Sequence, residues 1–146
     1  MTRLAASLCC LLALSAHAQP IAPPPIAARA YYLVDLLGGQ VLAAQSADDR
    51  FEPASLTKLM TAYVVFRAIR DKKLDTARVV TVSERAWKPE GSRMFIEPRK
   101  PVAVSDLLRG MIIQSGNDAA IALAEATAGS EEAFVQLMNQ IGRAHV

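Results

Sequence analysis

The stretch from Ser55 to about Arg70 has the apolar spacing of an amphipathic helix, and it constrains the fold more than any other segment. Pro53 lies just before it, where a fixed φ and a missing N–H suit a helix start. A buried stripe would hold Ser55 in one place at the first turn. The residues expected to form that stripe are Leu56, Leu59, Met60, Tyr63 and Val64, with Arg67 at its polar end.

Ser55 and Lys58 are three residues apart, so they share one face of this helix, with Cβ atoms roughly 5–6 Å apart. Serine is a weak nucleophile and needs a neighbouring base. Lysine can be that base when burial or another cation favours its neutral amine. The positive end of the helix dipole favours a serine alkoxide. The spacing therefore predicts a nucleophile and its base, although an N-cap serine followed by a solvated lysine has the same pattern.

The segments before and after this helix contain the expected strands. Residues 30–35 and 40–44 have strand composition and flank Gly38-Gly39, which predicts a β-hairpin. Residues 78–82 are a further short strand. Thr81 and Glu84 match a capping box that leads into a helical turn.

Three more helices are expected from their caps and apolar spacing. One starts at Ser105 and ends at Gln114, one is capped by Asp118 and runs to about Ala128, and one is capped by Ser130. Ser115-Gly116-Asn117 forms a bend between the first and second. Gly116 is expected to let the backbone turn and expose Ser115 and Asn117 on one rim, although these residue types also suit an ordinary helix–helix turn.

Residues 1–18 have the features of a secretory signal peptide. Arg3 supplies the positive charge, an apolar run follows, and Ala16-His17-Ala18 fits a cleavage site. Both cysteines lie inside this segment and would leave with it. Residues 19–28 are expected to form a proline-rich linker. The 146 residues suffice for one modest domain, and a net charge of +2 with scattered basic residues gives no argument for a nucleic-acid partner.

Two longer stretches identify a family. Residues 53–61 read Pro-Ala-Ser-Leu-Thr-Lys-Leu-Met-Thr, and residues 106–120 read Asp-Leu-Leu-Arg-Gly-Met-Ile-Ile-Gln-Ser-Gly-Asn-Asp-Ala-Ala. Residues 91–95, Gly-Ser-Arg-Met-Phe, look like a loop of the same family. Residues 29–140 therefore resemble the N-terminal part of a D-alanyl-D-alanine carboxypeptidase, a low-molecular-mass penicillin-binding protein whose signature includes Ser-x-x-Lys and a Ser-x-Asn element.

The resemblance implies a role for each motif residue. Ser55 would be the acyl-ester nucleophile that attacks the penultimate D-alanine of a peptidoglycan stem pentapeptide, and its backbone N–H would be half of an oxyanion hole. Lys58 would be the general base, and Ser115 would relay a proton to the leaving amine. Asn117 would bind the substrate amide and orient Lys58. β-Lactams would acylate Ser55 as covalent inhibitors, and neither a metal nor a cofactor is implied.

The resemblance also implies a fold and a location. The fold would be α/β, of the α+β type, similar to β-lactamases and DD-peptidases, with an antiparallel sheet packed on a helical cluster. The family's third element, Lys-Thr-Gly, does not occur in the 146 residues. We therefore expect an inactive fragment with an N-terminal hairpin and the helical part. The full-length protein would be periplasmic and associated with the inner membrane through a C-terminal helix that this chain does not contain.

The last six residues, 141–146, match one reading frame of a sequencing-adapter oligonucleotide, so the gene is expected to continue after about Gln140. Three alternatives to a carboxypeptidase stay open at this point. Two are enzymes of the same superfamily, a β-lactamase or a DD-endopeptidase. The third is a non-catalytic protein that binds the cell wall.

Overall fold

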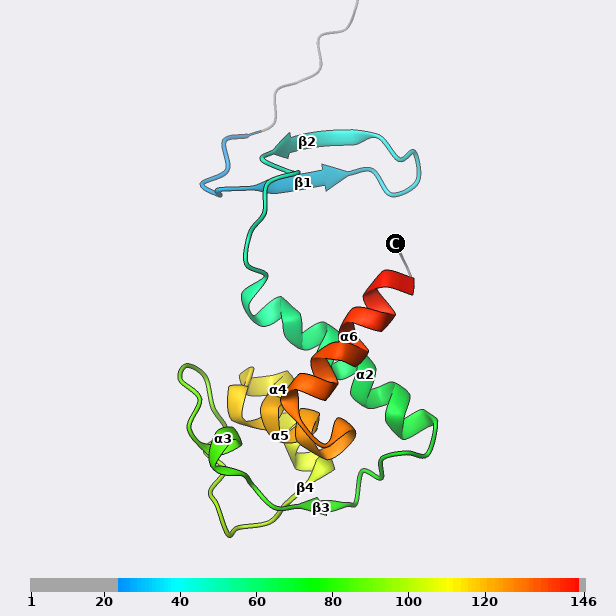
Figure 1. Cartoon of the computed structure of the whole chain (residues 1–146). Helices are drawn as coiled ribbons and strands as arrows, with labels where there is room; N and C mark the ends of the chain where they lie inside the picture. Colours follow the sequence, from blue (N-terminus) through cyan, green and yellow to red (C-terminus); the bar gives the residue numbers. More distant parts are fainter. Residues whose placement is uncertain (1–23, 145–146) are drawn as a thin grey trace, which may run out of the picture. The chain divides into compact units, whose positions relative to one another are not determined.

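The structure is a computed structural model that describes residues 24–144 (Figure 1). The expected signal peptide and residues 19–23 of the expected proline-rich linker therefore lie outside the described residues. The chain divides between Phe51 and Glu52 into two compact units. All four candidate site residues belong to the second unit.

The first unit contains the expected hairpin, formed by β1 (Tyr31–Val34) and β2 (Val41–Gln45) in antiparallel pairing. Leu33 pairs with Ala43 and Val34 with Val41, so the register shifts between these pairs. The turn is closed by the Asp35 carboxylate, which accepts a hydrogen bond from the Gly38 N–H at 2.7 Å. The prediction of a hairpin is confirmed.

The second unit is a helical cluster with one small sheet, and α5 is its central helix because it contacts α2, α3, α4 and α6 (Figure 1). Buried alanines along α5 let these neighbours approach closely. Its elements are η1 (Ala54–Leu56), α2 (Thr57–Arg70), β3 (Val79–Val80), α3 (Glu84–Trp87), β4 (Val102–Ala103), α4 (Val104–Gln114), α5 (Asn117–Ala128) and α6 (Glu131–Ala144).

The strands β3 and β4 pair in an antiparallel two-stranded sheet, with Val79 opposite Ala103 and Val80 opposite Val102. The core lies between the helices, and its largest fully buried apolar side chains are Phe134, Leu107, Leu123, Val65 and Val104. The chain thus has the expected mixed α/β fold, with small antiparallel sheets and a helical cluster. Within residues 24–144, no helix has the length and apolar character needed to cross a bilayer.

The helix expected from Ser55 starts differently from the prediction. Residues 54–56 form a single 3₁₀ turn, and the α-helix begins at Thr57 and ends at Arg70. The expected start is therefore corrected by two residues, and the end is confirmed. Ser55 is consequently held in the tighter turn that precedes α2.

The buried face of α2 was also predicted wrongly in part. Leu56 is 68% exposed and Leu59 is 71% exposed, whereas Val65 is fully buried. The reason is that α2 is apolar on two opposite faces, and α4, α5 and α6 cover only one of them among the described residues. The residues that this face buries are Thr61, Val64, Val65 and Ala68.

The cap predictions had mixed outcomes. Ser130 does cap α6, since its Oγ accepts from the Ala133 N–H at 3.1 Å. Thr81 does not cap α3; Ser83 does, because its extended backbone places Oγ 2.9 Å from the Ala86 N–H. Asp118 was wrongly predicted to cap α5, which follows Gly116 and has Asp118 in its first turn.

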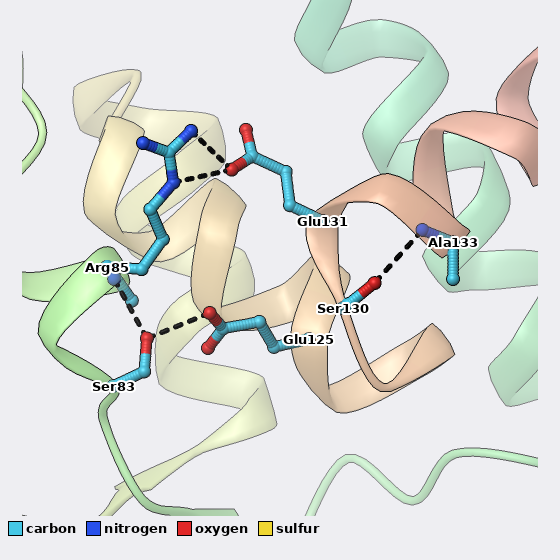
Figure 2. Close-up of polar contacts among 7 residues, drawn as sticks. Ser83, Arg85, Glu125, Ser130, Glu131 and Ala133 are labelled. Atoms are coloured by element: carbon cyan, nitrogen blue, oxygen red, sulfur yellow. Dashed lines mark hydrogen bonds and ion pairs between the residues drawn. The ribbon is translucent and has the colours of Figure 1, made fainter.

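Polar contacts attach the short helix α3 to its neighbours (Figure 2). The Ser83 hydroxyl donates to Glu125 on α5 at 2.8 Å. The Arg85 guanidinium pairs with Glu131 at the start of α6, with Nη2 2.7 Å from the carboxylate. This hydrogen bond and the carboxylate charge raise the pKa of Arg85. The pair lies at the surface, so it orients α3 and contributes little stability.

The first prediction concerns Phe134, the largest fully buried side chain, which packs α6 into the core. Phe134→Ala should reduce the free energy of unfolding by about 3–5 kcal/mol, because it removes buried apolar surface and leaves a cavity. Urea denaturation followed by circular dichroism would measure this. The control is Val135→Ala on the same helix, where the side chain is 43% exposed and the expected change is within about 0.5 kcal/mol. Equal losses in both variants would contradict the packing described.

The second prediction concerns Glu132 in the first turn of α6. Its pKa is lowered, first by a hydrogen bond from its own backbone N–H and second by the Ser130 hydroxyl. A carboxyl whose pKa is lower in the folded state stabilises that state above its ordinary pKa of about 4.3 and loses this contribution as pH falls through the lowered value. Glu132→Gln should therefore be less stable than the unmodified protein at about pH 7, and the difference should be smaller at about pH 3, which lies below the ordinary pKa of about 4.3. Urea titrations at both pH values would measure it, and a difference independent of pH would contradict the assignment.

Candidate active site

The four side chains that the sequence singled out meet at one place in the second unit. Ser55 Oγ lies 3.3 Å from Lys58 Nζ and accepts a hydrogen bond from Ser115 Oγ at 3.0 Å. Lys58 Nζ also donates to Asn117 Oδ1 at 2.6 Å. A serine hydroxyl, an amine, a second hydroxyl and an amide are thus joined in one chain of hydrogen bonds. Such a chain can move a proton away from Ser55 and return it.

Ser55 comes from the 3₁₀ turn η1, directly before the positive end of α2. The residue before it, Ala54, has φ +45°, a left-handed conformation that costs a non-glycine residue about 1–3 kcal/mol. The Ser55 side chain is exposed, whereas Lys58 one turn later is half-buried. The hydroxyl can therefore reach a ligand while the amine is partly shielded from water.

The bend that carries Ser115 and Asn117 turns at a different residue from the one expected. Ser115 itself has the left-handed conformation, with φ +56°, and ends α4, while Gly116 has φ −61°. Glycine is needed at 116 for space, because a Cβ there would lie 2.9 Å from Asp118 Oδ1 and 3.3 Å from the Gly110 carbonyl oxygen. Ser115 and Asn117 are half-buried rather than exposed as expected, and both contact the Ser55–Lys58 pair from this bend.

Two carbonyls from the loop after α3 fix the orientation of Asn117. Its Nδ2 donates to the Glu90 carbonyl at 2.6 Å, and its backbone N–H donates to the Ser92 carbonyl at 2.7 Å. With Nδ2 turned toward Glu90, Oδ1 faces Lys58. Gly91 lies between the two carbonyls with φ +83°, and a Cβ there would come within 2.9 Å of Asn117 Nδ2. The second Nδ2 hydrogen is left as a possible donor to a ligand.

Sequence reasoning missed Asp118 as part of this region. Instead of capping α5, its carboxylate is fully buried and accepts from the Met94 N–H at 3.0 Å and the Ile96 N–H at 3.2 Å. The Gly-Ser-Arg-Met-Phe resemblance at residues 91–95 drew attention to this loop. No sequence pattern indicates that its amides converge on Asp118, because that contact joins residues more than twenty positions apart.

A groove of about 410 Å³ opens beside these residues. Lys58, Glu90 and Asn117 line it together with Val135 and Met138 of α6, whereas Ser55 and Ser115 are not among its lining residues. The groove therefore places the amine and the amide of the cluster beside apolar side chains that could contact a ligand's carbon skeleton.

Comparisons with known proteins agree with the motifs. A profile of the D-alanyl-D-alanine carboxypeptidase family matches residues 16–144. The chain is 47% identical over 127 residues to D-alanyl-D-alanine carboxypeptidase DacC of Escherichia coli strain K12, covering 83% of this chain and 32% of that protein. It therefore spans about a third of the length of this curated relative.

Solved structures have the same fold. Penicillin-binding protein 5 from Haemophilus influenzae superposes with a TM-score of 0.77 at 43% identity, covering 85% of this chain and 37% of that one. Penicillin-binding protein D2 from Listeria monocytogenes, in the ampicillin-bound form, superposes with a TM-score of 0.70 at 26% identity, covering 85% and 49%. The family resemblance and the fold expected from the sequence are both confirmed.

The third prediction tests the close packing behind the bend. A Cβ on Gly110 of α4 would overlap the Met94 sulfur and lie 3.0 Å from the Met94 Cβ. Gly110→Ala should therefore lower the free energy of unfolding by about 1–3 kcal/mol, since the loop must shift. The matched control is Gly142→Ala in α6, where a Cβ meets nothing within 4 Å and alanine should add about 0.5–1 kcal/mol. Thermal or urea denaturation would measure both, and a stabilising Gly110→Ala would contradict the contact.

Proposed function

The chain belongs to the D-alanyl-D-alanine carboxypeptidase family, and we propose that its four clustered side chains are the catalytic centre of a serine-type carboxypeptidase acting on peptidoglycan stem pentapeptides. The observation that carries the proposal is the position of Ser55 Oγ, 3.3 Å from an amine and 3.0 Å from a second hydroxyl. A non-catalytic cell-wall-binding protein does not account for a serine held between these two groups, whereas a β-lactamase or a DD-endopeptidase of the same superfamily would use the same arrangement.

In the first step, Ser55 Oγ attacks the carbonyl carbon of the penultimate D-alanine, and its proton moves to Lys58 Nζ. A neutral lysine amine can donate one N–H to Asn117 Oδ1 and still direct its lone pair at Ser55. The carbonyl oxygen becomes an oxyanion, for which the Ser55 backbone N–H is the proposed donor from this chain. The positive end of α2 favours this negative charge.

In the second step, the tetrahedral intermediate collapses and the bond to the terminal D-alanine nitrogen breaks. Ser115 passes its own proton to that nitrogen and takes the proton that Lys58 holds, so D-alanine leaves as a neutral amine, Lys58 is neutral again and Ser55 carries an ester. Water then attacks the ester and gives its proton to Lys58, which passes a proton to Ser55 Oγ as the ester bond breaks; this restores the Ser55 hydroxyl and releases the shortened peptide. The hydrogen bond from Ser115 Oγ to Ser55 Oγ supports this relay.

Asn117 is the proposed substrate-binding residue. Its Oδ1 is bound to Lys58 and one Nδ2 hydrogen to the Glu90 carbonyl, so the other Nδ2 hydrogen is directed by two fixed contacts. A donor held in this way can bind the carbonyl of a peptide amide without further ordering. β-Lactams should enter the same site and acylate Ser55, as the ampicillin-bound form of the Listeria neighbour suggests.

We propose this activity for the full-length gene product. The 146 residues contain no Lys-Thr-Gly segment, which we expect to supply the second oxyanion donor, so the chain by itself should turn over no substrate. The proposed substrate lies outside the inner membrane, and export through a signal peptide at residues 1–18 is part of the proposal.

The fourth prediction tests Ser55 and Lys58 in the full-length gene product. The unmodified protein should be labelled covalently by a fluorescent penicillin, and Ser55→Ala should not be labelled, because the ester cannot form. Lys58→Ala should acylate about 10²–10⁴-fold more slowly, since general-base assistance is lost. Gel fluorescence at timed intervals would measure the acylation rates.

The control is Ser105→Ala in the first turn of α4, which should be labelled at the unmodified rate. Labelling of Ser55→Ala would exclude Ser55 as the nucleophile, and no labelling of the unmodified protein would favour a non-catalytic cell-wall-binding protein. Release of D-alanine from a pentapeptide, compared with ampicillin turnover, separates a carboxypeptidase from a β-lactamase.

A further inference from the structure

Asp118 is the most deeply buried charged group near the proposed catalytic centre, with none of its surface exposed. Its Oδ1 accepts from the Met94 N–H at 3.0 Å and from the Ala119 N–H at 2.8 Å, and its Oδ2 accepts from the Ile96 N–H at 3.2 Å. Among residues 24–144, no lysine, arginine or histidine forms an ion pair with it. Backbone amides alone therefore satisfy this carboxylate.

Burying a carboxylate without a cation costs free energy unless its hydrogen bonds are good. The hydrogen bonds of Asp118 fix the backbone of residues 94–96. Phe95 lies between the two donating amides with φ +62°, a left-handed conformation that a phenylalanine rarely adopts. This conformation lets the amides on both sides of Phe95 face one anion, as in backbone anion-binding nests. The carboxylate compensates for the strain.

The loop held by Asp118 is the one that orients Asn117. Residues 90–96, here called the bracing loop, supply the Glu90 and Ser92 carbonyls that bind the Asn117 side chain and backbone. The Ser92 hydroxyl also donates to the Gln114 carbonyl, just before the bend. The bracing loop thus contacts residue 114 and residue 117, on both sides of Ser115. Asp118 attaches the other end of the same loop to the first turn of α5.

We propose that Asp118 is a positioning residue for the catalytic centre. It holds the bracing loop against the bend, so that the Asn117 amide stays turned toward Lys58 and the left-handed Ser115 stays within reach of Ser55. Without the carboxylate, Phe95 leaves its left-handed conformation, the Glu90 carbonyl moves away from Asn117, and the amide is free to rotate. The inference rests on the proposed function, because it assigns Asp118 a role in the same acylation step.

Asp118→Asn in the full-length gene product tests this. The substitution keeps the shape of the side chain but replaces one acceptor oxygen by an NH₂ group, which cannot accept a hydrogen bond from a backbone N–H. Acylation by a fluorescent penicillin, measured per folded molecule, should slow by about 10–100-fold. Amide hydrogen exchange at Met94 and Ile96 should accelerate at the same time, while the buried residues of α2 keep their protection. The matched control is Glu125→Gln, an acid on the same helix that binds Ser83, and it should acylate at the unmodified rate.

Faster exchange at Met94 and Ile96 with an unchanged acylation rate would show that Asp118 only stabilises the fold, and the inference would be wrong. Unchanged exchange at both amides would also overturn it. If Asp118→Asn does not fold, Ser92→Ala is the second test, because it removes an exposed hydrogen bond of the bracing loop. Acylation of Ser92→Ala should slow by about 3–10-fold. An unchanged acylation rate would contradict the proposal. Failure of the unmodified protein to be labelled is a different result, which contradicts the proposed function itself.

Discussion

The hydrogen bond between Lys58 Nζ and Asn117 Oδ1, at 2.6 Å, is the contact on which the site depends. It joins α2, which carries Ser55 at its start, to the bend between α4 and α5, which carries Ser115. The two segments are far apart in sequence, and each contributes half of the polar cluster. Because α5 packs against α2 and α4, the two segments that this part-buried contact joins are held next to each other by the helical cluster.

The site combines local strain with firm support. Ala54, Phe95 and Ser115 all have positive φ values, which are unfavourable for residues with side chains, and they lie beside Ser55, at the bracing loop and at the bend. Such conformations persist only where several surrounding contacts hold the backbone in place. The buried carboxylate of Asp118 and the absence of side chains at Gly91, Gly110 and Gly116 provide those conditions, because a Cβ at any of the three would come within 3 Å of another atom. Strain and close packing thus occur together around the proposed nucleophile.

The sequence predicted which helices and strands form more successfully than it predicted which helix face is buried and which residue caps each helix. The hairpin, the end of α2 and the cap at Ser130 were confirmed because they depend on local turn chemistry and spacing. The prediction that Leu56 and Leu59 are buried on α2 was wrong. This helix is apolar on two faces, so the packing of the neighbouring helices decides which face is buried. Thr81 and Asp118 were wrong as caps for a similar reason. Capping residues are interchangeable in sequence, and the packing of the loops decided which one was used.

By itself, the sequence determined which reactive groups the chain carries and its family: a serine and a lysine three residues apart, a Ser-Gly-Asn bend, and motifs long enough to identify the family. These are local patterns that can be read from the order of the residues, and the helical spacing of Ser55 and Lys58 brings these two side chains to one face. The tertiary structure alone decided that the bend meets Ser55 and Lys58, that Ser115 rather than Gly116 is left-handed, and that Asp118 holds the bracing loop. Each of these facts depends on contacts between residues distant in sequence, which arise only when the helices pack and exclude water.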